Sequence, residues 1–308
     1  MTTTNQPTWP LRSFLFVPAH RKEWVAKAVR VKPDAVVLDL EDSVPPDMQM
    51  LARESLPEEI AELVSHGVAP FLRIHQYSTH TADEIAAVVH PGLAGIILPK
   101  ANSAEEVRAL HDLLSFHEGR QGLAHCSIAI LPLPETAEGL QRAESLARAS
   151  SRVRGIVGVI SGPTSGDVAQ AFGFRATLGG VEQHYMNSKL VLDSRVAGAP
   201  YPICGVFGVP MDDLAAIEAM LKRARDFGDT GSSIMHPSHV AITHAVYSPT
   251  KEEAEYYEGM LQAFAEAERA GQGAFRYRGA MVDYAMRPLA EQVVAEYRRR
   301  QIQVASDE

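Results

Sequence analysis

Three acidic residues end a short apolar stretch near the N-terminus of the chain. The stretch AVVLDLEDSVPP covers residues 35–46, and Asp39, Glu41 and Asp42 come at the end of its apolar part, before two prolines. Carboxylates placed this close together repel one another, and burying them without partners costs several kcal/mol each. Their spacing therefore indicates that they hold something of opposite charge, either basic side chains or a metal ion.

Other charged or polar residues end further apolar stretches in the same way. They are Arg73 in FLRIHQ, Lys100 in LPK, Glu135 in LPETAEG, Gly166 and Asp167 in SGPTSGD, and His236 in MHP. A single charged residue after a strand is more often a solvated loop residue or a helix cap. Because so many fall at the same point of their stretches, we expect them to meet at one rim of the fold.

The residue types predict metal-assisted chemistry. Mg²⁺ prefers oxygen ligands and is usually held by one or two carboxylates plus substrate oxygens, a role that suits Glu135 and Asp167. No group of histidines has zinc-ligand spacing, which disfavours zinc. Arg73 can clamp a carboxylate or carbonyl oxygen and stabilise negative charge, as an enolate made by carbon–carbon cleavage requires. The acids of residues 39–42 would orient Arg73, Lys100 or a metal-bound water.

Eight apolar stretches of strand length must position these residues. They lie at 13–17, 35–40, 71–74, 93–98, 127–131, 155–160, 203–208 and 232–235. They are largely apolar rather than alternating, which is typical of strands covered on both faces in a parallel sheet.

Helical patterns separate the apolar stretches. One opens with Ser103 and Glu106 in capping-box spacing, and another covers residues 210–228, with acids in its first turn and Gly228 at its end. The alternation predicts an α/β fold, a (β/α)8 TIM barrel with a C-terminal helical extension, over a doubly wound open sheet. In such barrels the chemistry lies at the carboxyl ends of the strands.

The barrel repeat accounts for only part of the chain. We expect a catalytic domain over residues 1–248 and an extension over 249–308, formed by a long helix from about residue 248 to 271, a loop and a further helix. These elements need a surface to pack on, and a neighbouring subunit would supply one.

Composition narrows the class of protein. Hydrophobic residues make up 46% and charged residues 22% of the 308 residues, as in proteins with a sizeable core. A net charge of −9 without a basic stripe argues against nucleic acid as a partner. Cys126 and Cys204 are far apart, which disfavours a disulfide or structural zinc site and fits a cytoplasmic location. The first residues lack a signal-peptide pattern, and no apolar run approaches the roughly 20 residues of a membrane span.

A family resemblance rests on eight motifs found in order between about Arg12 and Leu289. They are RSFLFVPAHR, AVVLDLEDSV, LRIH, GIILPK, LPETAEG, GD followed by FG, IMHPSHV and GAMVDYAMRPLA. In this order they resemble the citrate lyase β-subunit-like proteins of the HpcH/HpaI aldolase and malyl-CoA lyase superfamily.

The resemblance implies a Mg²⁺-dependent carbon–carbon lyase acting on a CoA thioester such as malyl-CoA, citramalyl-CoA or citryl-CoA, or on a small 2-oxo or hydroxy acid. It also implies a homotrimer or hexamer. It makes Glu135 and Asp167 the metal ligands and Arg73 the clamp on a substrate oxygen. Asp283 resembles an aspartate that the C-terminal segment brings to a neighbouring subunit's site.

The same resemblance extends to further site residues. Arg12 resembles an arginine near the substrate, and Asp39, Glu41 and Asp42 resemble the acidic cluster of the family. We expect Lys100, Gly166 and His236 to contact substrate, with Gly166 standing where the family often has an acid.

Three other functions stay open. One is a thioesterase of the same family, in which the same site hydrolyses the acyl-CoA. Another is a class II pyruvate aldolase with His20 as its base. The last is a non-catalytic barrel that binds CoA esters, which intact acids and Arg73 disfavour. Cys204 and His239 stand where the family often has an acid and a glutamine, so the acyl group is not set by the motifs.

Overall fold

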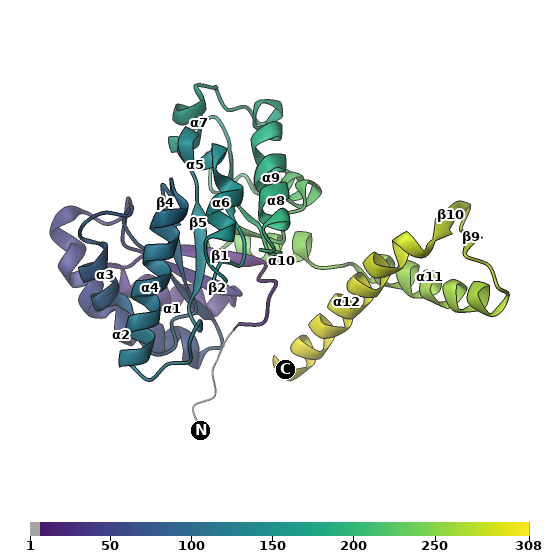
Figure 1. The fold of residues 1–308 in the computed structure, drawn as a ribbon, viewed down its shortest axis with the longest axis horizontal. Coiled ribbons are helices and arrows are strands. Elements are labelled where there is room, and N and C mark those ends of the chain that lie inside the picture. The colour runs from purple at the N-terminus through teal and green to yellow at the C-terminus, as the bar shows by residue number, and fades with distance from the viewer. Residues whose placement is uncertain (1–6, 308) are drawn as a thin grey trace. The chain divides into compact units, whose positions relative to one another are not determined.

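The computed structural model describes residues 7–307 and divides the chain into two compact units, one ending at Thr243 and the other beginning at His244. Figure 1 shows the strands and surrounding helices of the first unit, and the paired helices of the second.

The first unit is a nearly closed barrel of eight parallel strands, which confirms the predicted fold. Their order in the sheet is β5-β4-β3-β2-β1-β8-β7-β6. The strands are β1 (Ser13–Pro18), β2 (Ala35–Asp39), β3 (Ala69–Arg73), β4 (Gly95–Pro99), β5 (Ala129–Leu133), β6 (Val157–Ser161), β7 (Ile203–Phe207) and β8 (Gly231–Ile234). End strand β5 contacts the segment that precedes β6, because the backbone N–H of Ile130 donates to Arg152 O at 3.0 Å.

Helices connect successive barrel strands, and one more helix follows β8. They are α1 (Lys22–Ala28), α2 (Gln49–Ser65), α3 (Thr81–Val88), α4 (Ala104–Arg120), α5 (Ala137–Gln141), α6 (Ala143–Arg148), α7 (Asp167–Phe172), α8 (His184–Val196), α9 (Leu214–Phe227) and α10 (His239–Tyr247). The division between the two units falls within α10.

Local signals explain where these helices begin and end. The capping box of Ser103 and Glu106 opens α4, as predicted. Helix α9 begins later than the sequence pattern suggests, because the Asp213 side chain caps the helix by accepting from the Ala216 N–H. It ends at Gly228, whose φ of 107° suits a residue without a side chain.

Buried strands provide the core of the barrel. All five residues of β2 are buried, and its Val37 lies in register with Phe16 of β1 and Phe71 of β3. Their apolar side chains explain why the strand pattern lacks alternation, since helices cover the outer face while other side chains fill the inside. The register also sets Asp39 beside Arg73 at the carboxyl end of the sheet.

The second unit consists of α11 (Lys251–Arg269), a hairpin and α12 (Arg287–Asp307). The hairpin, β9 (Ala274–Tyr277) and β10 (Ala280–Asp283), replaces the loop that we expected there. Its two-residue turn has positive φ at both Arg278 and Gly279, the conformation that matches strand twist in tight hairpins. Met260 and Phe264 of α11 pack with Val282 of β10 and Ala290 of α12 in a small core.

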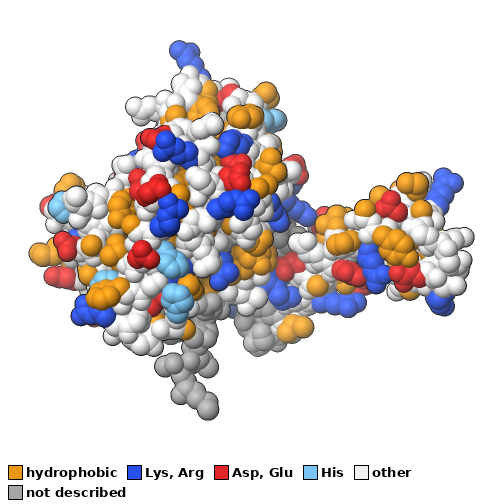
Figure 2. Space-filling model, in the orientation of Figure 1, with side chains coloured by type: hydrophobic (Ala, Val, Ile, Leu, Met, Phe, Trp, Pro, Cys, Tyr) orange, Lys and Arg blue, Asp and Glu red, His pale blue; other side chains and the backbone are white. Residues whose placement is uncertain are grey.

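The described surface carries both kinds of charge. Figure 2 shows acidic and basic side chains interspersed over the face in view, with no broad area of one sign. Among residues 7–307, no helix combines the length and the apolar character that crossing a membrane requires.

Candidate active site at the mouth of the barrel

A cavity of about 430 Å³ opens at the carboxyl ends of the barrel strands. Its volume lies within the range of pockets that bind small molecules. Polar side chains gather on part of its wall: Asp39, Asp42, Ser43, Arg73, Glu135, Asp167 and Ser233. This is the rim at which the sequence places the chemistry.

Arg73 and Asp39 form the central ion pair of the cavity. They lie in register across β3 and β2, and the Nε and Nη2 atoms of Arg73 donate to the two carboxylate oxygens of Asp39 at 2.6 Å each. Burial raises the pKa of Asp39, but the hydrogen bonds and charge of Arg73 more than offset this and leave the pKa below its ordinary value. Arg73 therefore approaches the cavity with one edge of its guanidinium already occupied.

Glu41 links Arg73 to Lys100. Its Oε1 accepts a hydrogen bond from Lys100 Nζ at 2.8 Å, and its Oε2 lies 3.0 Å from Arg73 Nη1. Asp42 is more exposed and lies 3.8 Å from the same Lys100 nitrogen. Burial raises the pKa of Glu41 despite its two basic neighbours. The structure thus brings the acids of residues 39–42 together with two basic side chains.

Lys100 joins this cluster to the next two strand ends. Its φ of 48° is unusual for a residue with a side chain and falls directly after β4. The Lys100 backbone N–H donates to Glu135 Oε1 at 3.3 Å, and its Nζ lies 3.4 Å from Asp167 Oδ2. A backbone held in a sparsely populated region here is consistent with a functional constraint.

Glu135 and Asp167 are the two acids best placed to hold a metal ion. Glu135 follows β5, and Asp167 is the first residue of α7 after β6. Burial raises the pKa of Glu135 to about 7, and the negative charge of Glu41 adds to this effect. The carboxylate of Glu135 is therefore costly in its present surroundings, and a cation beside it would relieve that cost.

The donor set suits a hard divalent cation. Five acidic side chains face only Arg73 and Lys100, and within the described residues neither histidine nor cysteine lines the cavity. Glu135 and Asp167 supply two carboxylates, which is how proteins commonly hold Mg²⁺, with waters and substrate completing its shell. The residues present therefore fit Mg²⁺.

Two further residues were predicted to contact the substrate, and only one of them lines the cavity. Gly166 lines it, beside Phe207. His236 is exposed, and its Nδ1 lies 2.7 Å from Ser238 Oγ. The residue before it, Met235, lines the cavity, whereas His236 itself does not.

Arg12 does not line the cavity. It precedes β1 and therefore lies at the amino end of the strands, opposite the mouth. There its backbone and guanidinium both bind Asp34, with Arg12 Nη2 2.7 Å from Asp34 Oδ1. Arg12 thus joins the starts of β1 and β2, and its substrate contact stays a prediction.

Asp283 lies in the second unit, at the end of β10. It is partly buried, and its carboxylate accepts a hydrogen bond from the Ala285 N–H at 3.0 Å. This contact caps a short turn before α12, so Asp283 has a local structural role whatever its part in chemistry.

The apolar wall of the cavity was missed by reasoning from charged residues. Phe16, Trp24 and Phe207 line it, and the Phe16 ring lies 5.2 Å from the Arg73 guanidinium carbon. Phe16 stands between buried Leu15 and Val17 in β1. Successive side chains of a strand point to opposite faces. Counting every second residue of β1 could therefore have indicated which of its side chains face the barrel interior.

The chain is similar to known proteins over most of its length. The model of the family described as HpcH/HpaI aldolase/citrate lyase matches residues 12–239. A citrate lyase subunit beta-like protein of Deinococcus radiodurans is 28% identical, over 92% of this chain and 95% of its own. The human mitochondrial citramalyl-CoA lyase is 27% identical, over 92% and 85%.

Two further comparisons bear on activity and fold. A (3S)-malyl-CoA thioesterase of Cereibacter sphaeroides is 28% identical, over 93% of this chain and 94% of its own. The crystal structure of CitE from Mycobacterium tuberculosis, in complex with magnesium, acetoacetate and coenzyme A, superposes with a TM-score of 0.72. That protein is 23% identical, over 93% of this chain and 97% of its own, so it supports the barrel fold.

Proposed function

Because the chain belongs to the HpcH/HpaI aldolase/citrate lyase family, we propose that it is a Mg²⁺-dependent carbon–carbon lyase. Its substrate would be a 3-hydroxyacyl-CoA thioester of the malyl-CoA, citramalyl-CoA or citryl-CoA type, cleaved or formed through an enolate. The observation that carries the proposal is the cluster at the barrel mouth, where Arg73 and four carboxylates line the cavity and the ion pair of Lys100 with Glu41 contacts them. Relatives named as citrate lyase-like protein and citramalyl-CoA lyase support it.

Each side chain has a role that follows from its contacts. Glu135 and Asp167 would hold Mg²⁺, which when bound supplies a Lewis acid that polarises a substrate oxygen. Arg73, fixed by Asp39, presents its Nη1 edge toward Glu41 and would stabilise negative charge that develops on the substrate. Because Asp39 sets this orientation in advance, little reorganisation is needed during the reaction.

Lys100 and Glu41 form an ion pair that contacts residues lining the cavity. Their 2.8 Å hydrogen bond keeps the ammonium group between Glu41 and Asp167. We assign Lys100 and Gly166 to substrate binding and Glu41 and Asp42 to orienting Arg73 and Lys100. The apolar part of the wall would limit water near the reacting carbon. A substrate contact of His236 stays a prediction.

A thioesterase is the second candidate. It is favoured by the Cereibacter sphaeroides relative named (3S)-malyl-CoA thioesterase, which matches nearly the full length of both chains. The same electrostatic environment would support hydrolysis of the thioester. In that reaction water attacks the acyl carbon and the C–S bond breaks, whereas a lyase breaks a carbon–carbon bond. The class II aldolase alternative has less support, because His20 does not line the cavity in the described structure.

We further propose a homo-oligomer, a trimer or hexamer. Met281, Tyr284 and Leu289 surround Asp283 in the sequence, and each is about half exposed or more in the described structure. Side chains of this kind favour burial against another protein surface. The cytoplasmic location stays a prediction.

A panel of CoA thioesters incubated with Mg²⁺ tests the proposed activity. A lyase releases acetyl-CoA or propionyl-CoA together with a keto acid, whereas a thioesterase releases free CoA and the intact hydroxy acid. Chromatography of the CoA products separates the two. Chelator should stop the reaction and Mg²⁺ should restore it. Release of no product from any 3-hydroxyacyl-CoA of the panel would contradict the proposal and favour a barrel that only binds CoA esters.

A further inference from the structure

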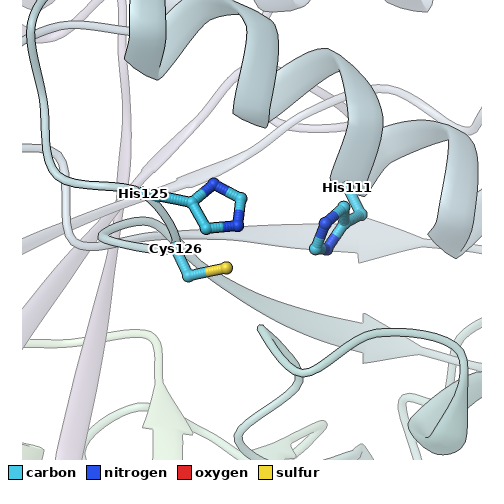
Figure 3. Close-up of side chains that lie close together, drawn as sticks. All are labelled: His111, His125 and Cys126. Atoms are coloured by element: carbon cyan, nitrogen blue, oxygen red, sulfur yellow. The ribbon is translucent and has the colours of Figure 1, made fainter.

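Two histidines and a cysteine meet on the side of the barrel away from its mouth. Among the described residues, His111, His125 and Cys126 are a group whose potential ligand atoms all lie within 4.8 Å of one another. His111 comes from α4, and the other two come from the loop between α4 and β5. Figure 3 shows the three side chains directed toward a common space.

The position of this cluster separates it from the candidate active site. His125 and Cys126 precede β5, whereas Glu135 follows that strand. Loops that precede the strands of a parallel barrel lie at its amino end, opposite the catalytic mouth. None of the three residues lines the cavity described above. A ligand bound here would therefore occupy a second, independent site.

The cysteine is held in place by a buried ion pair. Its backbone N–H donates to Glu118 Oε2 at 3.0 Å, and Glu118 forms a fully buried ion pair with Arg152. Cys126 has a φ of 60°, a conformation that costs energy for most residues with a side chain. Because Glu118 also accepts from the Ile128 N–H at 2.9 Å, the loop is fixed on both sides of Ser127. The thiol is thus presented by an ordered backbone.

A second contact orients the histidine on α4. The Nδ1 atom of His111 lies 2.7 Å from Ser150 Oγ, in the loop before β6. Hydrogen bonds of this kind set the orientation of metal-binding imidazoles. The His111 and His125 rings lie 6.0 Å apart at an angle of 79°, so they approach edge to face instead of stacking.

We propose that His111, His125 and Cys126 form a binding site for a divalent transition-metal ion, with Zn²⁺ as the ion it suits best. Two imidazoles and a thiolate match the ligand preference of Zn²⁺, whereas the oxygen-only set at the barrel mouth matches Mg²⁺. Ligands of one tetrahedral Zn²⁺ lie about 3.3–3.8 Å apart, given its usual bond lengths. His125 is exposed, so rotation of its side chain can bring the group to that spacing.

Three protein ligands leave one coordination position for water or another small ligand. Such an open site is typical of exchangeable or catalytic zinc, whereas structural zinc usually has four protein ligands. Bound Zn²⁺ would also join α4 to the loop before β5. Residue spacing does not indicate this site, because the second half of α4 and the following loop separate His111 from His125 and Cys126. Only the fold brings the three together.

Cobalt(II) is the probe for the test, because its spectrum reports both thiolate ligation and tetrahedral geometry. The full-length protein would be reduced, freed of metal, supplied with excess Mg²⁺ to occupy the barrel mouth, and titrated with Co²⁺. We expect a sulfur-to-cobalt charge-transfer band and intense visible bands at one Co²⁺ per chain, both removed by Zn²⁺. Cys126→Ser should abolish the charge-transfer band and weaken Zn²⁺ binding at least about 100-fold.

Matched variants separate this site from other sources of binding. Cys204→Ser alters the buried cysteine, and His66→Gln alters an exposed histidine elsewhere, so both should retain the wild-type spectrum. His125→Gln changes an exposed side chain and should lose affinity without loss of fold. Ser150→Ala should weaken binding about 10-fold through His111 alone.

The outcomes decide the proposal in either direction. A Co²⁺ spectrum without the charge-transfer band, or Zn²⁺ affinity that is unchanged in both Cys126→Ser and His125→Gln, would overturn it. A band that persists in Glu135→Gln would support independence from the barrel mouth, and its loss in that variant would contradict the separation of the two sites.

Discussion

At the scale of single residues, Arg73 decides what the candidate active site can do. Two of its nitrogens are taken by Asp39, so Nη1 alone is directed toward Glu41 and Asp42. The Arg73 side chain is largely buried, and the contact of its guanidinium with the Phe16 ring further limits its movement. A guanidinium with one fixed edge has the preorganisation that electrostatic catalysis requires.

Arg73→Lys tests this role, because it keeps the positive charge and removes the planar fork. We expect kcat to fall at least about 100-fold, on the scale of one lost oxyanion donor. Steady-state kinetics with the thioester identified in the panel would measure it. Arg53→Lys is the matched control, since Arg53 pairs with buried Glu84 but does not line the cavity. A near-normal kcat in Arg73→Lys would assign Arg73 to structure only.

Glu135→Gln and Asp167→Asn test the metal site. Each replaces a carboxylate with a neutral group of similar shape, so we expect Mg²⁺ affinity to fall at least about 100-fold and activity to be lost. The fold should persist, because Glu135 now faces the like charges of Glu41 and Asp167. Calorimetric titration with Mg²⁺ and thermal unfolding would measure the two effects.

The control for the metal site is Glu138→Gln, one turn further along the chain. Glu138 is exposed and pairs with Arg142, so its loss should leave Mg²⁺ binding unchanged. Full activity of both Glu135→Gln and Asp167→Asn in chelator-treated buffer would exclude the proposed metal site.

At the scale of elements, the predictable parts are those with strong local signals. The eight largely apolar stretches correspond to the eight barrel strands, and the Ser103 capping box is at the start of α4. The strand ends then brought Glu41, Arg73, Lys100 and Glu135 together, since parallel strands share one carboxyl rim. Local pattern plus fold class was enough for these features.

Features set by turn conformation or distant contacts were not predictable in this way. The β9–β10 hairpin depends on a left-handed backbone conformation at Arg278 and Gly279. Of these two residues, only the glycine indicates such a turn in the sequence. The motif that contains Arg12 does not indicate that this residue lies before β1, at the amino end of the strands. The His111 cluster joins separate elements, which no spacing rule covers.

Helix α2 contains a buried acid whose charge should cost stability at high pH. Both carboxylate oxygens of Glu59 are buried, and burial raises its pKa to about 7 from 4.5, which Ser55 and the charge of Lys22 only partly offset. The folded state therefore holds this proton more tightly than the unfolded state. Stability should fall as pH rises from about 4.5 through 7, by about 2 kcal/mol for this group.

Glu59→Gln removes that titration. We expect the variant to gain about 2 kcal/mol relative to wild type between pH 5 and pH 8, measured by urea unfolding at both values. Glu58→Gln is the control, because the neighbouring Glu58 is exposed and pairs with Lys22 at the surface. An identical pH dependence of wild type and Glu59→Gln would show that Glu59 is solvated or paired in solution.

At the scale of the whole molecule, the second unit poses the question of assembly. Its own core is small, formed around Met260, Phe264, Val282 and Ala290. Met281 is 69% exposed, and Tyr284 is 50% exposed. This combination of a small core and exposed apolar side chains beside Asp283 supports the proposal that the unit completes its burial against another subunit.

Subunit mixing tests whether Asp283 serves a neighbouring active site. Glu135→Gln and Asp283→Asn should each be inactive alone, but a mixture unfolded and refolded together should recover part of the activity. Recovery is expected because some mixed sites would combine an intact Glu135 from one chain with an intact Asp283 from another. A chain truncated at Gly271 should keep its barrel, by circular dichroism, and lose activity. If exchanged mixtures, verified by mass spectrometry, recover nothing, Asp283 acts within its own chain or only caps the turn at Ala285.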